Sequence, residues 1–205
     1  MGSLTRKIAP VLVAPLIMMG MWMQPAGASG NQFAFDYVVN ASTTLKKLNQ
    51  TVTVPPGTFK GTIDFGTGAL SGAINLPPAT VQIKLAGIIP LVTVNVRMVP
   101  TKKVTGLVDF TSTPFTVTAT ATMNIRITSA YVGTLKMVNL VGTTCTTSKP
   151  LSVTMSGPAN LGGPSTFSGT YTIPPLKTCG HLTPVLNQVV PGPGNTFTAV
   201  ATPAS

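Results

Sequence analysis

Acidic and imidazole side chains are almost missing from this chain. Its 205 residues include three aspartates (Asp36, Asp64 and Asp109), no glutamate and one histidine, His181. Most enzymes use carboxylates or imidazoles to move protons, hold metals or activate nucleophiles. The alternative is a serine triad built on His181, but the sequence has no G-x-S-x-G elbow to support one. The composition therefore predicts a non-enzymatic protein with no catalytic residues, no cofactor and no metal site.

Aromatic residues are also scarce, at 6% of the chain. Trp22 is the single tryptophan, and it lies in a segment that we expect to be removed from the mature protein. Sugar-binding platforms usually depend on exposed aromatic rings. This scarcity therefore weighs against a carbohydrate-binding module.

The first 28 residues have the pattern of a signal peptide. Arg6 and Lys7 precede an apolar run over 8–23, and Ala26 and Ala28 supply the small residues of a cleavage site. A membrane anchor is the alternative, although the run is short for a span of about 20 residues. We therefore expect residues 1–28 to be removed, leaving 29–205 as a single secreted β-sandwich domain. Its predicted location is extracellular or associated with the cell envelope.

Positive charge dominates what remains. Without Arg6 and Lys7, 11 basic residues stand against three acidic ones, a formal net charge of +8. This balance favours anionic envelope polymers or acidic lipids as partners. Nucleic acid is not expected, because the lysines are scattered and no nucleic-acid-binding motif is present. The alternative is that the lysines only keep the protein soluble.

The two cysteines, Cys145 and Cys179, predict one disulfide, because exported proteins mature in an oxidising compartment. The bridge would close a loop of about 35 residues and stabilise the fold by roughly 3–4 kcal/mol. Two alternatives remain. One is a thiol site with His181, and the other is a zinc site that needs a further ligand.

Alternation of polar and apolar residues predicts β-structure along most of the chain. The clearest case is 116–127, where Val117, Ala119, Ala121, Met123, Ile125 and Ile127 would share one face and threonines the other. Residues 131–141 are apolar on both faces, as in a strand buried between layers. We expect an all-β fold, an antiparallel β-sandwich (Ig-like or related) with a barrel-like form as the alternative.

Proline and glycine indicate where the strands end. Pro55-Pro56-Gly57 and Gly162-Gly163-Pro164 are turn sequences between apolar runs. Near the C-terminus, one short helix is expected over 183–190. Thr183 would cap it, Pro184 fits its first position, and Pro191 would end it.

The last third of the chain includes Phe167-Ser168-Gly169-Thr170, then Cys179-Gly180, and ends with Pro191-Gly192-Pro193-Gly194-Asn195-Thr196-Phe197. This pattern resembles a group of secreted actinobacterial β-rich proteins of uncharacterised function, with a similar cysteine pair and a PGPGNTF-like end. The resemblance implies a secreted β-rich fold, a Cys145–Cys179 bridge and a structural corner at 191–197. It implies no catalytic residue.

Three functions fit these observations. The first is a secreted or envelope-associated protein with a structural, adhesive or binding role. The second is a carrier of a lipid or other apolar ligand, with a cavity lined by aliphatic residues and by Met98, Met123, Met137 and Met155. The third is a pore-forming barrel, although the aromatic girdles of such barrels are missing.

Overall fold

The computed structural model describes residues 31–204, except 86–88, 133–137 and 161. The expected signal peptide (1–28), its cleavage residues Ala26 and Ala28, and Met137 lie outside the described residues. The chain from Asn31 onward forms one compact unit.

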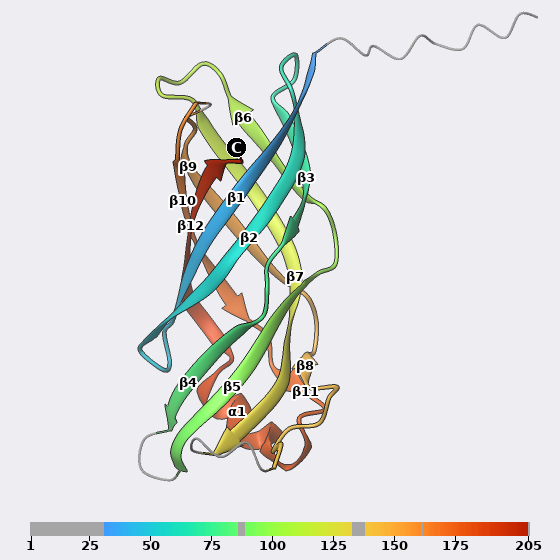
Figure 1. Ribbon diagram of the computed structural model, residues 1–205, viewed down its shortest axis with the longest axis vertical. Helices are drawn as coiled ribbons and strands as arrows, with labels where there is room; N and C mark the ends of the chain where they lie inside the picture. Colours follow the sequence, from blue (N-terminus) through green and yellow to red (C-terminus); the bar gives the residue numbers. More distant parts are fainter. Residues whose placement is uncertain (1–30, 86–88, 133–137, 161, 205) are drawn as a thin grey trace, which may run out of the picture. The chain divides into compact units, whose positions relative to one another are not determined.

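The described part is built almost entirely of antiparallel strands, with one short α-helix near the C-terminus (Figure 1). The predicted all-β antiparallel fold is thus confirmed, and the sheet takes its barrel-like form. In chain order the elements are β1 (Gln32–Leu45), β2 (Gln50–Asp64), β3 (Ala69–Asn75), β4 (Ala79–Leu85), β5 (Ile89–Pro100), β6 (Val104–Asp109), β7 (Thr116–Val132), β8 (Thr146–Thr147), β9 (Leu151–Pro158), β10 (Ser165–Ile173), β11 (Leu176–Lys177), the 3₁₀ helix η1 (Gly180–Leu182), α1 (Thr183–Val189) and β12 (Gly192–Pro203).

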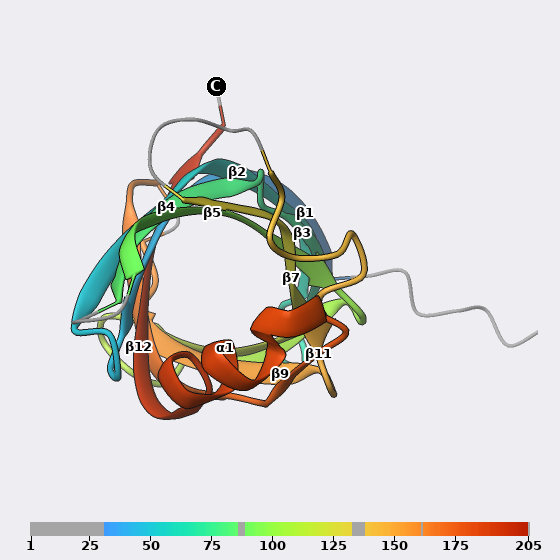
Figure 2. The same ribbon diagram turned by 90° about the horizontal axis from the view of Figure 1, so that it is seen from below.

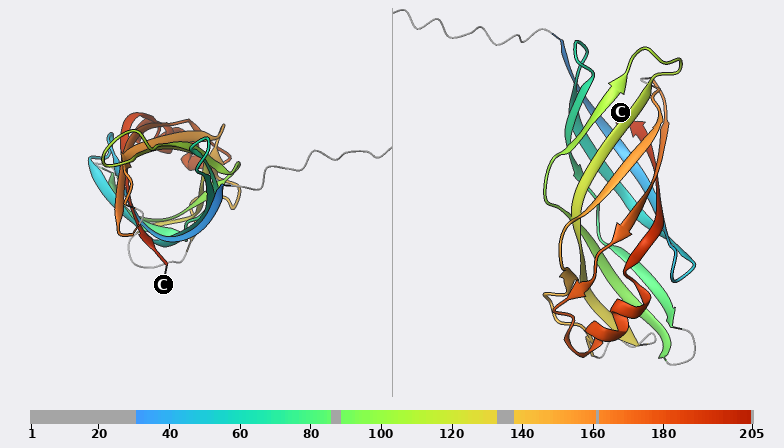
Figure 3. Two further views of the ribbon diagram at one scale, coloured as in Figure 1. Left: turned by 90° about the horizontal axis from the view of Figure 1, so that it is seen from above. Right: turned by 180° about the vertical axis from the view of Figure 1, so that it is seen from behind.

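Eight of the described strands close into a barrel, in the order β7-β6-β3-β2-β1-β12-β10-β9, and β9 pairs again with β7. The ring is visible when the molecule is viewed along the barrel (Figure 3). β7 is long enough, at 17 residues, to pair with β6 and β9 along its first half and with β5 along its second half. β4 and β5 therefore extend the wall at the end where α1 lies (Figures 1 and 2).

Along β7 and the other long barrel strands, apolar side chains mostly face the interior and hydroxyl-bearing ones mostly face outward. On β7, Val117, Ala121, Met123 and Ile127 are buried, as the alternation predicts. Their outward neighbours join a row of cross-strand partners that spans six strands: Thr118, Ser156, Ser168, Thr198, Ser42 and Thr53. A membrane pore requires an apolar outward face. The observed arrangement is the reverse of what the pore alternative needs.

The interior contains three groups of packed side chains, which follow one another along β7. Val117 belongs to the group at the β6–β7 loop, Ala121 and Met123 to the middle one, and Ile127 to the group beside α1. In the last group, Leu186 of α1 packs with residues of β4, β5 and β7. We call the end beside α1 the closed end of the barrel. The opposite end, with the β2–β3 and β6–β7 loops and the smallest core group, is called the open end because neither described helix covers it.

Three local predictions needed correction or refinement. β2 continues through Pro55 and Pro56, because the register with β1 shifts at this point and such an irregularity tolerates residues without an amide donor. No continuous buried strand covers 131–141: β7 ends at Val132, Val138 is exposed, and 133–137 lie outside the described residues. The helix forms where expected, but Thr183 is its first residue rather than its cap. The Thr183 hydroxyl accepts a hydrogen bond from the Cys179 amide and donates one to the Gly180 carbonyl.

Candidate functional site

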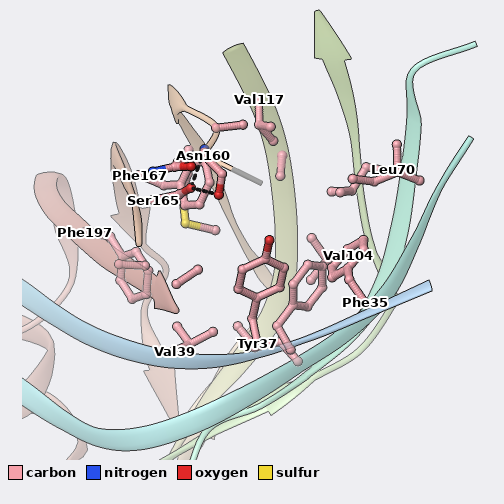
Figure 4. A pocket seen from close by; sticks show the side chains of 18 residues that line it. Phe35, Tyr37, Val39, Leu70, Val104, Val117, Asn160, Ser165, Phe167 and Phe197 are labelled. Atoms are coloured by element: carbon pink, nitrogen blue, oxygen red, sulfur yellow. Dashed lines mark hydrogen bonds between the residues drawn. The ribbon is translucent and has the colours of Figure 1, made fainter. Parts of the chain in front are cut away.

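The barrel interior contains an apolar cavity of about 100 Å³. Figure 4 shows the surrounding side chains pointing into it. All eight barrel strands contribute to its lining, together with the β9–β10 loop: Phe35, Tyr37, Val39, Phe59, Ile63, Leu70, Ile74, Val104, Val117, Ala119, Met155, Ala159, Asn160, Ser165, Phe167, Phe197, Ala199 and Ala201. An apolar cavity of similar size, about 150 Å³, stays free of water and takes up benzene. The lumen is smaller than that cavity but has the same apolar character, which is typical of a site for a small apolar group.

Small residues on the wall make room for large aromatic rings. Gly61 of β2 and Gly72 of β3 are direct cross-strand partners. A Cβ atom at Gly61 would lie 2.8 Å from Cζ of Phe35, and one at Gly72 would lie 2.6 Å from Cε2 of Phe59. The two rings thus lie directly on the glycines, 5.5 Å apart between their centroids.

Few polar groups reach the lumen, and two of them lie at its open end. These two groups are Asn160 and Ser165. The Ser165 hydroxyl accepts a hydrogen bond from the backbone N–H of Asn160 at 2.8 Å and donates one to the backbone carbonyl of Asn160 at 3.3 Å. The third group is the hydroxyl of Tyr37, which points into the cavity (Figure 4). A few polar groups around an apolar pocket orient a ligand. This arrangement suits a ligand with an apolar part inside and a polar part near the Asn160–Ser165 corner.

Toward the closed end, buried hydrogen bonds fix the strands. The Tyr171 hydroxyl lies 2.7 Å from Thr43 Oγ1, and burial raises the pKa of Tyr171, although this hydrogen bond partly opposes the effect. Asn195, only 2% exposed, accepts a hydrogen bond from the Lys46 amide and donates to the Gly192 and Tyr171 carbonyls. One amide side chain thus joins the β1–β2 hairpin, β10 and β12.

Asn195 lies within the segment predicted to be a structural corner, 191–197. There the chain leaves α1 and enters β12, with Gly192 at φ +151° and Gly194 at φ +79°. These conformations favour glycine, because a Cβ atom would be strained in them. The segment has a packing role and contributes Phe197 to the lumen lining.

Cys145 and Cys179 form a disulfide, as predicted. Both are fully buried in the closed-end core, beside Leu176 and Leu186. Neither is a free thiol, so the thiol and zinc alternatives do not hold. The bridge ties the segment after β7 to the segment before α1.

His181 and the three aspartates, which could orient it in a serine triad, do not come together. His181 is exposed in η1 at the closed end, whereas Asp64 and Asp109 are the last residues of β2 and β6 at the open end. Asp36 instead pairs with Lys60, with 2.6 Å between Oδ2 and Nζ. Hydrogen bonds from Thr111 hold the pKa of Asp109 below its ordinary value. Among the described residues, no three histidine, cysteine or acidic side chains gather as metal ligands.

The sequence identified only part of the lumen. Of the four methionines predicted to line a cavity, Met155 does so, Met123 is buried in the middle core, Met98 packs against that core, and Met137 lies outside the described residues. The phenylalanines of the lining were not singled out. The signal was present, because Phe33, Phe35, Tyr37 and Val39 fall on one face of an alternating segment.

No helix in the described part of the chain is long and apolar enough to cross a membrane. Comparisons with protein-family models, with curated proteins and with solved structures find no match for this chain.

Proposed function

We propose that this chain is a non-enzymatic, exported binding protein whose barrel lumen takes up the apolar part of a lipid-like ligand. The observation behind this proposal is the apolar cavity to which every barrel strand contributes. The larger packed core beside α1 closes one end, so we place ligand entry at the other end, past the smaller core group of Ile63, Leu70, Val108 and Val117. The signal-peptide pattern and the buried disulfide favour a location outside the cytoplasm, secreted or in the cell envelope.

The size of the cavity limits the ligand. About 100 Å³ accommodates only a small part of an acyl chain, so a longer ligand must displace the rings of Phe35 and Phe59 or remain partly outside. Because the lining has no charged side chain, recognition inside would rest on shape and burial rather than on ion pairs. The polar end of the ligand would stay near Asn160 and Ser165.

Uptake of the uncharged dye N-phenyl-1-naphthylamine tests this proposal. We expect its fluorescence to rise with wild-type protein and a long-chain fatty alcohol to displace it. Ala119→Phe places a phenyl ring in the lumen and should abolish uptake, with Ala119→Leu as a milder variant if the larger ring destabilises the barrel. Thr118→Phe adds the same ring to the outward face of the same strand and should leave uptake unchanged. Equal uptake by all variants would contradict lumen binding.

A structural or adhesive role toward anionic polymers is the second candidate, and one observation favours it. The outer surface has a groove of about 690 Å³ beside the C-terminal end of β10, with Lys47 and Lys149 in its wall. Lys47 Nζ donates a hydrogen bond to the Gln188 carbonyl, which holds this ammonium group at the groove. Salt-sensitive binding to an anionic envelope polymer, weakened by Lys47→Ala with Lys149→Ala, would support this role. Unchanged binding by the double variant would exclude the groove.

A further inference from the structure

A cluster of phenylalanines is exposed at the open end of the barrel. Phe33, Phe65 and Phe115 are 52%, 44% and 36% exposed. Phe110 joins them into one patch: the ring centroids of Phe33 and Phe65 are 6.0 Å apart, those of Phe65 and Phe110 5.5 Å, and those of Phe110 and Phe115 5.4 Å. We call these four residues the phenylalanine rim. Contiguous exposed apolar surface of this kind marks an interaction site.

The phenylalanine rim continues the lining of the lumen. Phe33 lies two residues before Phe35 on β1, and Phe65 lies two residues after Ile63 of β2. Phe115 likewise lies two residues before Val117 of β7. Because side chains two apart on a strand share a face, the inward apolar face of these strands extends past the ends of the strands into the loops. The apolar face that lines the cavity therefore continues to the phenylalanine rim, and Phe110 packs against the core group between them.

The charges around the rim are few and do not attract anions. Asp64 and Asp109 flank it, and each is held by its own loop. Asp64 Oδ1 accepts hydrogen bonds from the amides of Gly66 and Thr67 at 2.8 and 3.0 Å, and Asp109 Oδ1 accepts one from the Thr111 amide at 2.9 Å. By contrast, the β1–β2 hairpin with Lys46 and Lys47, and Lys149 ahead of β9, lie toward the other ends of their strands (Figure 1). Lys102 and Lys103 precede β6, at the end of that strand away from Asp109, and Lys60 of β2 is paired with Asp36. An anionic surface would thus meet these lysines rather than the rim.

We propose that the phenylalanine rim docks on the surface of an uncharged or zwitterionic lipid layer, so that an apolar ligand passes between that layer and the lumen. The docking step stands on the rim alone, whereas the transfer step rests on the proposed function of the lumen. Docking would bury the exposed rings in the lipid layer and bring the open end of the barrel to its surface.

A tryptophan placed in the rim tests the docking step directly. Trp22 is the single tryptophan of the chain and lies in the expected signal peptide, so secreted protein cleaved after Ala28 has no other tryptophan signal. With phosphatidylcholine vesicles, Phe65→Trp should show a blue-shifted emission that brominated phosphatidylcholine quenches. Leu107→Trp is the matched control, because Leu107 is 62% exposed but lies outside the rim on β6. Its emission should not change.

Vesicle co-sedimentation measures how strongly the rim binds. Each of Phe65→Ser and Phe115→Ser should weaken partitioning into phosphatidylcholine vesicles about tenfold, because a half-exposed ring loses part of the burial energy of a phenylalanine. Leu107→Ser should have no effect, and added salt should change binding little. Dye uptake by the serine variants in vesicle-free buffer should match the wild type. Docking and lumen binding can therefore fail separately.

Three results would overturn the docking proposal. The first is that the rim variants partition into phosphatidylcholine vesicles as strongly as the wild type does. The second is binding to phosphatidylglycerol vesicles alone that disappears in salt, which would point to the lysines. The third is a wild-type dimer that becomes monomeric in Phe65→Ser and does not bind vesicles, which would make the rim an interface between two copies of the chain.

Discussion

Removal of the Cys145–Cys179 disulfide should lower stability more than any surface change. The bridge joins residues that are 34 positions apart in the sequence. Closing a loop of this length lowers the conformational entropy of the unfolded chain, which stabilises the folded state by about 3–4 kcal/mol. For a domain of this size, each kcal/mol corresponds to roughly 2–4 °C in Tm. We therefore expect the double variant Cys145→Ala with Cys179→Ala to melt about 10 °C below the wild type.

Differential scanning calorimetry measures this shift, and a reductant control separates loss of the bond from loss of the sulfur atoms. Wild-type protein unfolded and refolded under reduction should resemble the double variant. Both cysteines are fully buried against Leu176 and Leu186, so the shift should come with faster hydrogen exchange around α1. A Tm within about 2 °C of the wild type would refute the loop-closure argument.

Two further predictions concern the buried polar groups near the closed end. Asn195→Ala removes hydrogen bonds to Lys46, Gly192 and Tyr171, and should lower the free energy of unfolding by about 2–4 kcal/mol in chemical denaturation. The control is Thr196→Ala, at the exposed neighbouring position, which should lower the free energy of unfolding far less. Burial raises the pKa of Tyr171 above its ordinary value near 10.0. The neutral phenol therefore contributes stability to the folded state that is fully present below about pH 10. This contribution is lost as the pH rises through the raised pKa. Tyr171→Phe should remove this alkaline loss, and equally steep loss in both proteins would show that Tyr171 is not its source.

Sequence periodicity was sufficient to predict a strand and its inward residues wherever the strand has one face in solvent and the other buried. The segment 116–127 forms the first part of β7 with the expected inward residues, because alternation reports burial directly. The short helix was found for a similar local reason, since Pro184 and Pro191 bracket it. The disulfide followed from the compartment expected of an exported chain.

Local patterns failed where distant contacts decide the structure. Pro55 and Pro56 resemble a turn, yet β2 continues through them because β1 offers a partner with a shifted register. Closure of the barrel depends on the pairing of β7 with β9, two strands that are not consecutive in the chain, and no local residue pattern predicts this pairing. The cavity depends on which rings meet which small residues across the lumen, such as Phe59 over Gly72. Neither fact is encoded in the order of residues along any one strand.

The most direct test of lumen binding is native mass spectrometry of the protein isolated from its own host, compared with the same sample after denaturation. We predict extra mass on the native wild-type protein that disappears on denaturation and belongs to an apolar, lipid-like molecule. Ala119→Phe isolated in the same way should lack this mass, and Thr118→Phe should retain it. A wild-type protein that carries no added mass in its native state would contradict ligand binding in the lumen.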